Sequence, residues 1–204
     1  MARGLDALPL LALLRHGPTQ WTEERRLQGR TDLPLSAKGR RAVAGWRLAR
    51  EVDGFAWLTS PLRRASETAA LLGHGDAAVD GRLVEMSWGM WEGCRLVDLR
   101  REMGPAFSEL EDRGLDFRPA GGESPREVQA RLKPLLAEIA QNGHDCLAVT
   151  HKAAIRAIYS LASGWPLLGE PPVPLAEFAL HIFALAADGT PSVASLNLPL
   201  ESVA

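Results

Sequence analysis

The chain has 204 residues, of which 46% are hydrophobic and 24% are charged. These values are typical of one globular domain, and they exclude a collagen, a coiled coil and an intrinsically disordered chain. The formal net charge is −2, with 23 basic residues against 25 acidic ones. The length leads us to expect one domain over residues 1–204. Because nucleic-acid-binding proteins usually have a basic excess, we expect no nucleic-acid partner.

The cysteines and the first apolar segment indicate the cellular setting. Cys94 and Cys146 are far apart and form no C-x-x-C pattern, which predicts a reduced cytoplasmic protein without a disulfide framework or a zinc site. Residues 5–14 are apolar, but they are too few to span a membrane and lead into Arg15 without a small-residue cleavage site. We therefore predict a buried strand rather than a signal peptide, and no membrane partner.

Predicted strands and helices alternate along the chain, which indicates an α/β fold. We expect strands at residues 10–14, 55–59, 146–150 and 178–186, and a last strand near Val193. A turn at Asp188-Gly189 should connect the last two. Residues 80–123 are less regular and are expected to form an excursion over the sheet rather than a second domain.

The first two predicted helices begin at serine residues. Ser36 would cap a helix that runs to about Val52. Ser60 would cap the next helix with Pro61 at its first position, where the missing N–H costs nothing. That helix should end at Gly73.

Two further helices are predicted in the second half of the chain. Ser124-Pro125-Arg126-Glu127 has the form of a capping box, and the helix that it starts should be kinked at Pro134. Its apolar face is formed by Val128, Leu132, Leu135, Leu136 and Ile139. The other helix is expected from Lys152 to about Ala162.

Two histidines directly follow predicted strands. His16 comes after the first strand, and His151 comes after the strand that ends at Thr150. Ligands of open α/β sheets bind outside the carboxyl ends of the strands, so both histidines are candidates for one site. Arg63 and Arg64 lie in the first turn of a predicted helix, where the helix dipole opposes a cation unless an anion binds there.

Five motifs in chain order carry a family resemblance. They are Leu14-Arg15-His16-Gly17-Pro18-Thr19-Gln20-Trp21 followed by 28–36, then 59–69, 83–93, Gly121-Gly122-Glu123-Ser124 and Val149-Thr150-His151. Over residues 10 to about 160 the chain resembles the histidine phosphatase superfamily, the phosphoglycerate mutase-like enzymes. The resemblance implies a three-layer α/β/α sandwich with a mostly parallel central sheet.

The resemblance also implies a role for each matching residue. His16 would be the nucleophile that forms a phosphohistidine, and Glu85 would be the acid that protonates the leaving oxygen. Arg15, Arg63 and His151 would surround the phosphoryl group, with two guanidiniums and an imidazolium supplying positive charge. No cofactor and no metal are expected.

Other residues of the motifs are assigned less direct roles. Arg64 would be a neighbour of the phosphate site, and Glu92 would support the local turn. The residues expected to contribute to substrate binding are Gly17, Thr22, Gln28, Lys152 and Ala153.

The sequence departs from the family pattern at three positions of the motifs. Pro18 stands where the first motif often has Glu, and Thr22 stands where it often has Asn. Lys152 follows His151 where small residues are usual, so it either adds a cation to the site or points to solvent. These changes affect the expected substrate rather than the nucleophile.

The expected function is hydrolysis of a small organic phosphomonoester. The alternatives are a cofactor-dependent phosphoglycerate mutase, and a phosphate- or protein-binding module that has lost catalysis. Met86, Trp88, Met90 and Trp91 either pack under the excursion or line the pocket, where they would suit an apolar organic group. The oligomeric state is open, and a homodimer is compatible with the sequence.

Overall fold

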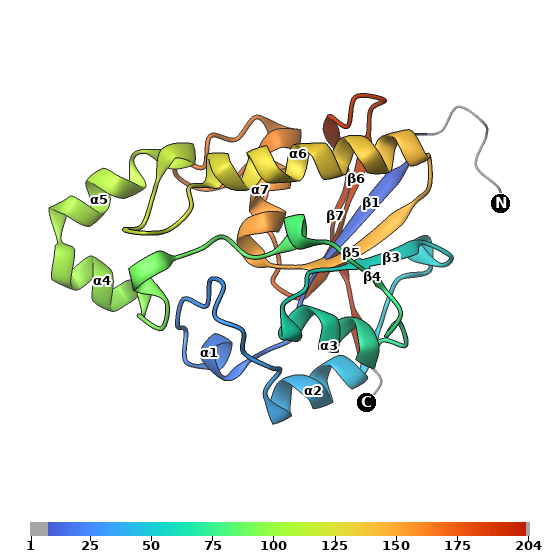
Figure 1. Cartoon of the computed structure of the whole chain (residues 1–204), viewed down its shortest axis with the longest axis horizontal. Helices are drawn as coiled ribbons and strands as arrows, with labels where there is room; N and C mark the ends of the chain where they lie inside the picture. Colours follow the sequence, from blue (N-terminus) through green and yellow to red (C-terminus); the bar gives the residue numbers. More distant parts are fainter. Residues whose placement is uncertain (1–7, 203–204) are drawn as a thin grey trace.

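The protein folds around β1 (Leu10–Arg15), which lies inside a six-stranded sheet with the strand order β4-β3-β5-β1-β6-β7. The computed structural model describes residues 8–202 (Figure 1). The beginning of the apolar segment 5–14 therefore lies outside the described residues. The other strands of this sheet are β3 (Ala56–Thr59), β4 (Ala78–Val79), β5 (Cys146–Thr150), β6 (Ala179–Leu185) and β7 (Pro191–Pro199).

Strand direction divides the sheet into two parts. The pairs β3·β4, β3·β5 and β1·β5 are parallel, whereas β6 runs antiparallel to β1 and β7. The carboxyl ends of β1, β3 and β5 therefore meet at one edge, and the register pairs Arg15 with Thr150 there. This is the three-layer α/β arrangement with a mostly parallel sheet that the family resemblance implies.

Helices cover both faces of the sheet (Figure 1). On one face lie α6 (Pro125–Asn142) and α7 (Lys152–Ser163), and on the other lie α2 (Ala37–Ala44) and α3 (Arg63–Leu71). The side chains of β1 alternate between the two layers, with Leu11 and Leu13 in the core under α6 and α7. Ala12 and Leu14 belong to the core on the other face. The central strand is thus buried on both sides, as its continuous apolar sequence indicates.

The helix α6 forms as its sequence predicts. The Ser124 hydroxyl accepts from the Glu127 N–H, and the Glu127 carboxylate accepts from the Ser124 N–H, which completes the capping box. The five residues of the predicted apolar face are all buried. The helix continues through Pro134 to Asn142 and ends at Gly143, which adopts the left-handed conformation.

Two predicted helix boundaries are wrong. The helix capped by Ser36 ends at Ala44 rather than near Val52, because the chain turns into β2 (Trp46–Arg47), which pairs with β8 (Glu201–Ser202). The next helix, α3, begins at Arg63 rather than at Pro61. The Ser60 hydroxyl contacts the Leu62 N–H and the ring of His151 instead of capping a helix.

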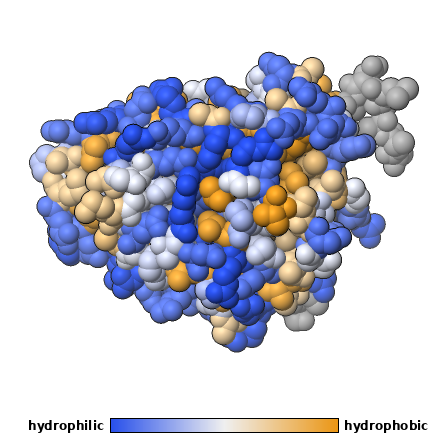
Figure 2. Space-filling view, viewed as in Figure 1, coloured by the Kyte–Doolittle hydropathy of each residue, from blue (hydrophilic) through white to orange (hydrophobic). Residues whose placement is uncertain are grey.

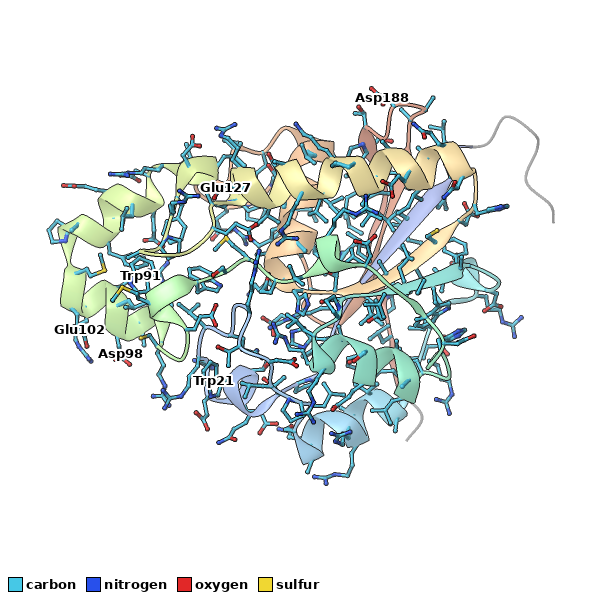
Figure 3. The ribbon with its side chains drawn as sticks, in the orientation of Figure 1. Trp21, Trp91, Asp98, Glu102, Glu127 and Asp188 are labelled. Atoms are coloured by element: carbon cyan, nitrogen blue, oxygen red, sulfur yellow. The ribbon has the colours of Figure 1, made fainter. Side chains whose placement is uncertain are left out.

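The excursion over residues 80–123 contains two short helices, α4 (Leu96–Met103) and α5 (Pro105–Glu111). Figure 3 shows Trp91 on the side of α4 that faces the rest of the excursion, with Asp98 and Glu102 on its outer side. Trp91 stacks on Phe107 of α5 with ring centroids 5.5 Å apart. Trp91 is therefore a core residue of the excursion. Met86 is buried as well, whereas Met90 is exposed.

Short elements complete the described chain. They are α1 (Gln20–Glu23) and the 3₁₀ turns η1 (Arg50–Val52), η2 (Gly81–Leu83), η3 (Gly89–Trp91) and η4 (Gly114–Asp116). The surface in the same view is mostly hydrophilic, with small separate apolar groups (Figure 2). None of the described helices is long and apolar enough to cross a membrane.

Candidate active site

The two predicted histidines meet at the carboxyl edge of the parallel strands. The backbone N–H of His16 donates to the carbonyl of Thr150, the last residue of β5, at 3.0 Å. This bond places the chain after β1 beside the chain after β5. As a result, the rings of His16 and His151 have centroids 5.1 Å apart, and both side chains are buried.

The His16 ring is held in one tautomer. Its Nδ1 lies 2.7 Å from the Gly17 carbonyl oxygen, which can only accept, so Nδ1 carries the hydrogen. The lone pair of a neutral ring is therefore on Nε2. Burial, and secondarily the charges of Arg15 and Arg64, hold the pKa of His16 well below its usual value. The ring is thus neutral and has a nucleophilic nitrogen at neutral pH.

Gly17 allows the first motif to pack tightly. A Cβ at this position would lie 2.3 Å from a methyl carbon of Val43, so a larger residue would displace α2. The Gly17 N–H donates to the Thr68 hydroxyl of α3 at 2.9 Å. In the described structure the Gly17 carbonyl therefore orients the His16 ring. The N–H of Gly17, a predicted binding residue, is bonded to Thr68 instead.

Arg64, rather than Arg63, lies beside the histidines. The Arg64 side chain is fully buried, and its Nε donates to His151 Nδ1 at 3.3 Å. Its two terminal nitrogens donate to the carbonyls of Thr31 and Gly29, at 2.9 and 2.7 Å. The guanidinium is thus fixed by three contacts within the site.

The Arg63 side chain lies on the solvent side of α3. It is 57% exposed, and its guanidinium is 3.5 Å from Glu67, one helical turn further on. The spacing of this i,i+4 pair was visible in the sequence, and it could have indicated that Arg63 faces solvent. Arg64 lies one turn before the buried Thr68, whose hydroxyl donates to the Arg64 carbonyl at 2.6 Å, so both residues are on the inner face of α3.

His151 is hydrogen-bonded on both ring nitrogens. Its Nδ1 accepts from Arg64, so Nε2 carries the hydrogen of the neutral ring and donates to the Ser60 hydroxyl at 2.8 Å. Burial, and then the charges of Arg64, His16 and Arg15, lower its pKa well below the usual value. The expected imidazolium is therefore a neutral imidazole in the described structure. Ser60 was not anticipated as a site residue.

Glu85 is a buried carboxyl group at the start of α7. Its Oε1 accepts from the backbone N–H groups of Met86 and Ala153, at 2.9 and 3.1 Å. Burial raises its pKa, against the opposing effect of these hydrogen bonds and of Arg64 and Arg15. Ala153, a predicted binding residue, thus contacts Glu85 through its N–H.

Arg15 lies at the end of β1 and is largely buried. Its Nη1 is 2.9 Å from a carboxylate oxygen of Glu177, and its guanidinium lies over the ring of Phe178. Apart from this ion pair, its buried Nε and Nη1 have no hydrogen-bond partner in the part of the chain that the structure describes. The Lys152 ammonium lies 3.1 Å from the same Glu177 oxygen, and its side chain is 56% exposed. Lys152 therefore shares an ionic partner with Arg15 and also contacts solvent.

Thr22 and Gln28 bond to each other. The Gln28 amide donates to the Thr22 hydroxyl at 2.9 Å and accepts from the Thr19 hydroxyl at 2.8 Å. Thr19 and Thr22 also form the capping box of α1. Within residues 8–202, these two predicted binding residues therefore contact the first motif and hydrogen-bond to neither histidine.

Glu92 connects the excursion to the segment that holds Arg64. Its carboxylate accepts from the backbone N–H groups of Arg30 and Thr31, each at 2.9 Å, and from the Thr31 hydroxyl. Gly29 has φ +53°, and a Cβ there would lie 2.0 Å from the Glu92 carboxylate. Glu92 thus supports the turn that presents the Gly29 and Thr31 carbonyls to Arg64.

Comparison with known proteins agrees with this geometry. The sequence model of the histidine phosphatase superfamily, branch 1, matches residues 11–198. The chain belongs to the histidine phosphatase superfamily. Its relatives include a probable phosphoglycerate mutase, GpmB, of Salmonella paratyphi C, 34% identical over 164 residues that cover 78% of this chain and 76% of the relative.

Solved structures of the superfamily have the same fold. Bacillus stearothermophilus YhfR has a TM-score of 0.77 at 30% identity, over 95% of this chain and 98% of that chain. A mycobacterial glucosyl-3-phosphoglycerate phosphatase in complex with VO3 has a TM-score of 0.75 at 26% identity, over 93% and 99% of the two chains. The proteins similar to this chain thus include a phosphatase and a probable mutase.

Proposed function

We propose that the protein is a phosphomonoester hydrolase that works through a phosphohistidine on His16. The observation that supports this most is the pair of opposite pKa shifts in one buried site. The lowered pKa of His16 keeps a neutral nucleophile, and the raised pKa of Glu85 favours a protonated acid. A nucleophile and an acid with separated pKa values are what cleavage of an unactivated ester requires.

In the first half of the proposed reaction, His16 Nε2 attacks phosphorus and the bond to the ester oxygen breaks. Glu85 gives its proton to the leaving oxygen, so the alcohol departs neutral. Arg64 and Arg15 stabilise the charge that spreads over the equatorial phosphoryl oxygens. Arg64 takes the role that the sequence assigns to Arg63, since its guanidinium lies against His151.

In the second half, a water molecule attacks the phosphohistidine. Glu85, now a carboxylate, takes a proton from this water while the phosphorus–nitrogen bond breaks. This step releases inorganic phosphate and leaves Glu85 protonated, as it was at the start. The incoming phosphate dianion would also raise the pKa of His151, since an anion stabilises the imidazolium.

The proposal is tested by phosphate release from a panel of phosphomonoesters in the presence of EDTA. Wild-type protein should release phosphate, and His16→Ala should release none above background. Within residues 8–202 no group of three His, Cys, Asp or Glu side chains is placed to hold a metal ion. We therefore expect EDTA to leave the rate unchanged, and a rate that only a divalent ion restores would contradict the proposed mechanism.

A mutase is the second candidate, because one relative with 34% identity is a probable phosphoglycerate mutase. It would return the phosphoryl group from His16 to another oxygen of the product instead of to water. Isomerisation of 3-phosphoglycerate in the presence of 2,3-bisphosphoglycerate, without net phosphate release, would favour this candidate. Binding without either reaction would favour a non-catalytic phosphate-binding module.

A further inference from the structure

A cavity of about 360 Å³ lies next to the reaction centre. It is lined by the first turns of α7 and by the segment 164–178, which leads from α7 to β6 and is drawn in orange in Figure 1. Its charged lining residues are Arg15, Lys152, Arg156, Glu170 and Glu177. Ile155, Trp165 and Leu175 contribute apolar walls. This combination of apolar walls and a few charged groups is typical of a small-molecule site.

The cavity adjoins the proposed site of bond cleavage through Arg15 and the first turn of α7. Arg15 connects the two, because it lines the cavity and is the last residue of β1, directly before His16. Lys152 lines the cavity, and the next residue, Ala153, donates its N–H to Glu85. Since Glu85 protonates the leaving oxygen in the proposed reaction, the alcohol portion of a substrate would leave the phosphorus on this side.

The three cations of the cavity differ in their partners. One carboxylate, that of Glu177, lies 2.9 Å from Arg15 and 3.1 Å from Lys152. Arg156 has no ion pair and no hydrogen bond to an acidic side chain among residues 8–202. Its guanidinium instead lies 4.6 Å from the centre of the Trp165 ring. Among these three cations of the described chain, Arg156 is therefore the one without an ionic partner.

The surroundings of Arg156 strengthen this conclusion. Burial lowers the pKa of its guanidinium, and no nearby carboxylate opposes that shift. A partly desolvated cation without an anion is unfavourable, and an entering carboxylate or phosphate would remove that cost. The guanidinium carbon lies over the Trp165 ring, and a guanidinium can bind a carboxylate or phosphate through two parallel hydrogen bonds.

We propose that this cavity binds the part of the substrate beyond the ester oxygen, and that Arg156 binds an anionic group on it, a carboxylate or a second phosphate. This inference rests on the proposed hydrolase function, because it assigns the leaving group to the cavity. It predicts that the enzyme prefers esters whose alcohol carries a negative charge.

The test compares matched esters in wild type and in Arg156→Met, which keeps an unbranched apolar stem and removes the charge. The carboxylate pair is 3-phosphoglycerate and glycerol 3-phosphate, and the phosphate pair is fructose 1,6-bisphosphate and fructose 6-phosphate. In one pair or both, wild type should prefer the charged ester. Arg156→Met should lower kcat/KM for that ester about tenfold or more, the effect of losing a charge-assisted hydrogen bond, and change the other ester less than twofold.

Two further variants serve as controls. Arg156→Lys should recover part of the preference, since it keeps the charge without the two parallel donors. Arg101→Met changes an arginine of α4 that is 72% exposed and should alter neither ester. If Arg156→Met lowers both esters of a pair equally, or if wild type shows no preference in either pair, the inference is overturned while the hydrolase function stands.

A binding measurement separates the inference from the proposed chemistry. In His16→Ala, calorimetry with the preferred charged ester should give a Kd that rises about tenfold when Arg156→Met is added, because binding needs no phosphohistidine. If wild type hydrolyses no ester but this difference in Kd is present, the hydrolase function fails and the anion site stands. An unchanged Kd contradicts the anion site whatever the catalytic result.

Discussion

His16 and Glu85 share one buried environment, and burial moves their pKa values in opposite directions. Burial always disfavours the charged form, which is the protonated form for a histidine and the deprotonated form for a carboxyl group. The two arginines oppose burial at Glu85 but act with it at His16. One buried site beside two cations therefore favours a neutral nucleophile and a protonated acid together.

We predict a bell-shaped dependence of kcat/KM on pH, with its optimum on the acidic side of neutral. Activity should fall at low pH as His16 becomes protonated, through its lowered pKa, and at high pH as Glu85 loses its proton, through its raised pKa. Initial rates with a substrate of poor leaving group, measured across pH 4 to pH 9, check this. A rate that still rises at pH 9 would contradict the assignment of Glu85.

The leaving group provides a control for the same assignment. In Glu85→Gln the alkaline limb should disappear, and the rate on an alkyl phosphate should fall about 100-fold or more, the usual size of a general-acid contribution. The rate on p-nitrophenyl phosphate should fall much less, since nitrophenolate leaves without a proton. Equal losses on both esters would show that Glu85 does not act as the acid.

Arg63 and Arg64 are neighbours in sequence with different surroundings. We predict that Arg64→Lys lowers kcat/KM about 100-fold, because an ammonium cannot reproduce the fixed guanidinium. Arg63→Lys should stay within about twofold of wild type, since an exposed i,i+4 ion pair contributes little. Melting temperatures of both variants are needed because Arg64 is fully buried. The reverse order of activities would restore the role that the motif assigns to Arg63.

At the scale of elements, the segment 28–31 and the excursion act together. Glu92 binds two backbone N–H groups of this segment, whose Gly29 and Thr31 carbonyls in turn accept from Arg64. The excursion therefore reaches the phosphate site indirectly, through one carboxylate and one turn. This explains how a Glu without contact to either histidine belongs to a motif of the site.

We predict that Glu92→Gln lowers kcat about tenfold and leaves the melting temperature within a few degrees, as expected for loss of one or two charge-assisted hydrogen bonds. A double-mutant cycle with Arg64→Lys distinguishes positioning from general stability. If Glu92 acts through Arg64, its substitution should have little further effect on kcat in the Arg64→Lys background. Additive effects of the two substitutions would contradict this connection. Glu111→Gln, on the exposed side of α5, serves as the neutral control.

At the scale of the whole molecule, the two cores share the central strands. Leu13 of β1 packs under α6 and α7, and Leu14 packs on the other face. Because both side chains are fully buried on one strand, neither layer can lose its packing without disturbing the other. The fold should therefore unfold as one unit.

We predict that Leu13→Ala and Leu14→Ala each lower the free energy of unfolding by about 2–5 kcal/mol, the range for truncation of a buried leucine. Both should shift the same single transition when unfolding is followed by tryptophan fluorescence and by circular dichroism. Val193→Ala, at an exposed position of β7, should change stability by less than about 0.5 kcal/mol. Two separate transitions would indicate layers that unfold independently.

Much of the fold follows from local sequence rules. The apolar runs at residues 10–14 and 146–150 predict buried strands, and the capping box at Ser124 predicts the start of α6. These predictions succeed because the contacts that decide them lie a few residues apart. The early end of α2 could not be foreseen, because Trp46 and Arg47 pair with residues about 155 positions further along the chain.

The candidate site, like the fold, was determined in part by the sequence and in part only by the tertiary structure. The sequence by itself determined which chemical groups are present and in what order: two histidines after parallel strands, an acidic motif and an arginine pair. Only the tertiary structure decided which arginine faces the histidines, since adjacent residues of a helix point about 100° apart and their orientation depends on how the helix packs. It also decided that Arg156 lines a cavity with Arg15, because α7 and the segment 164–178 meet there only in the folded chain.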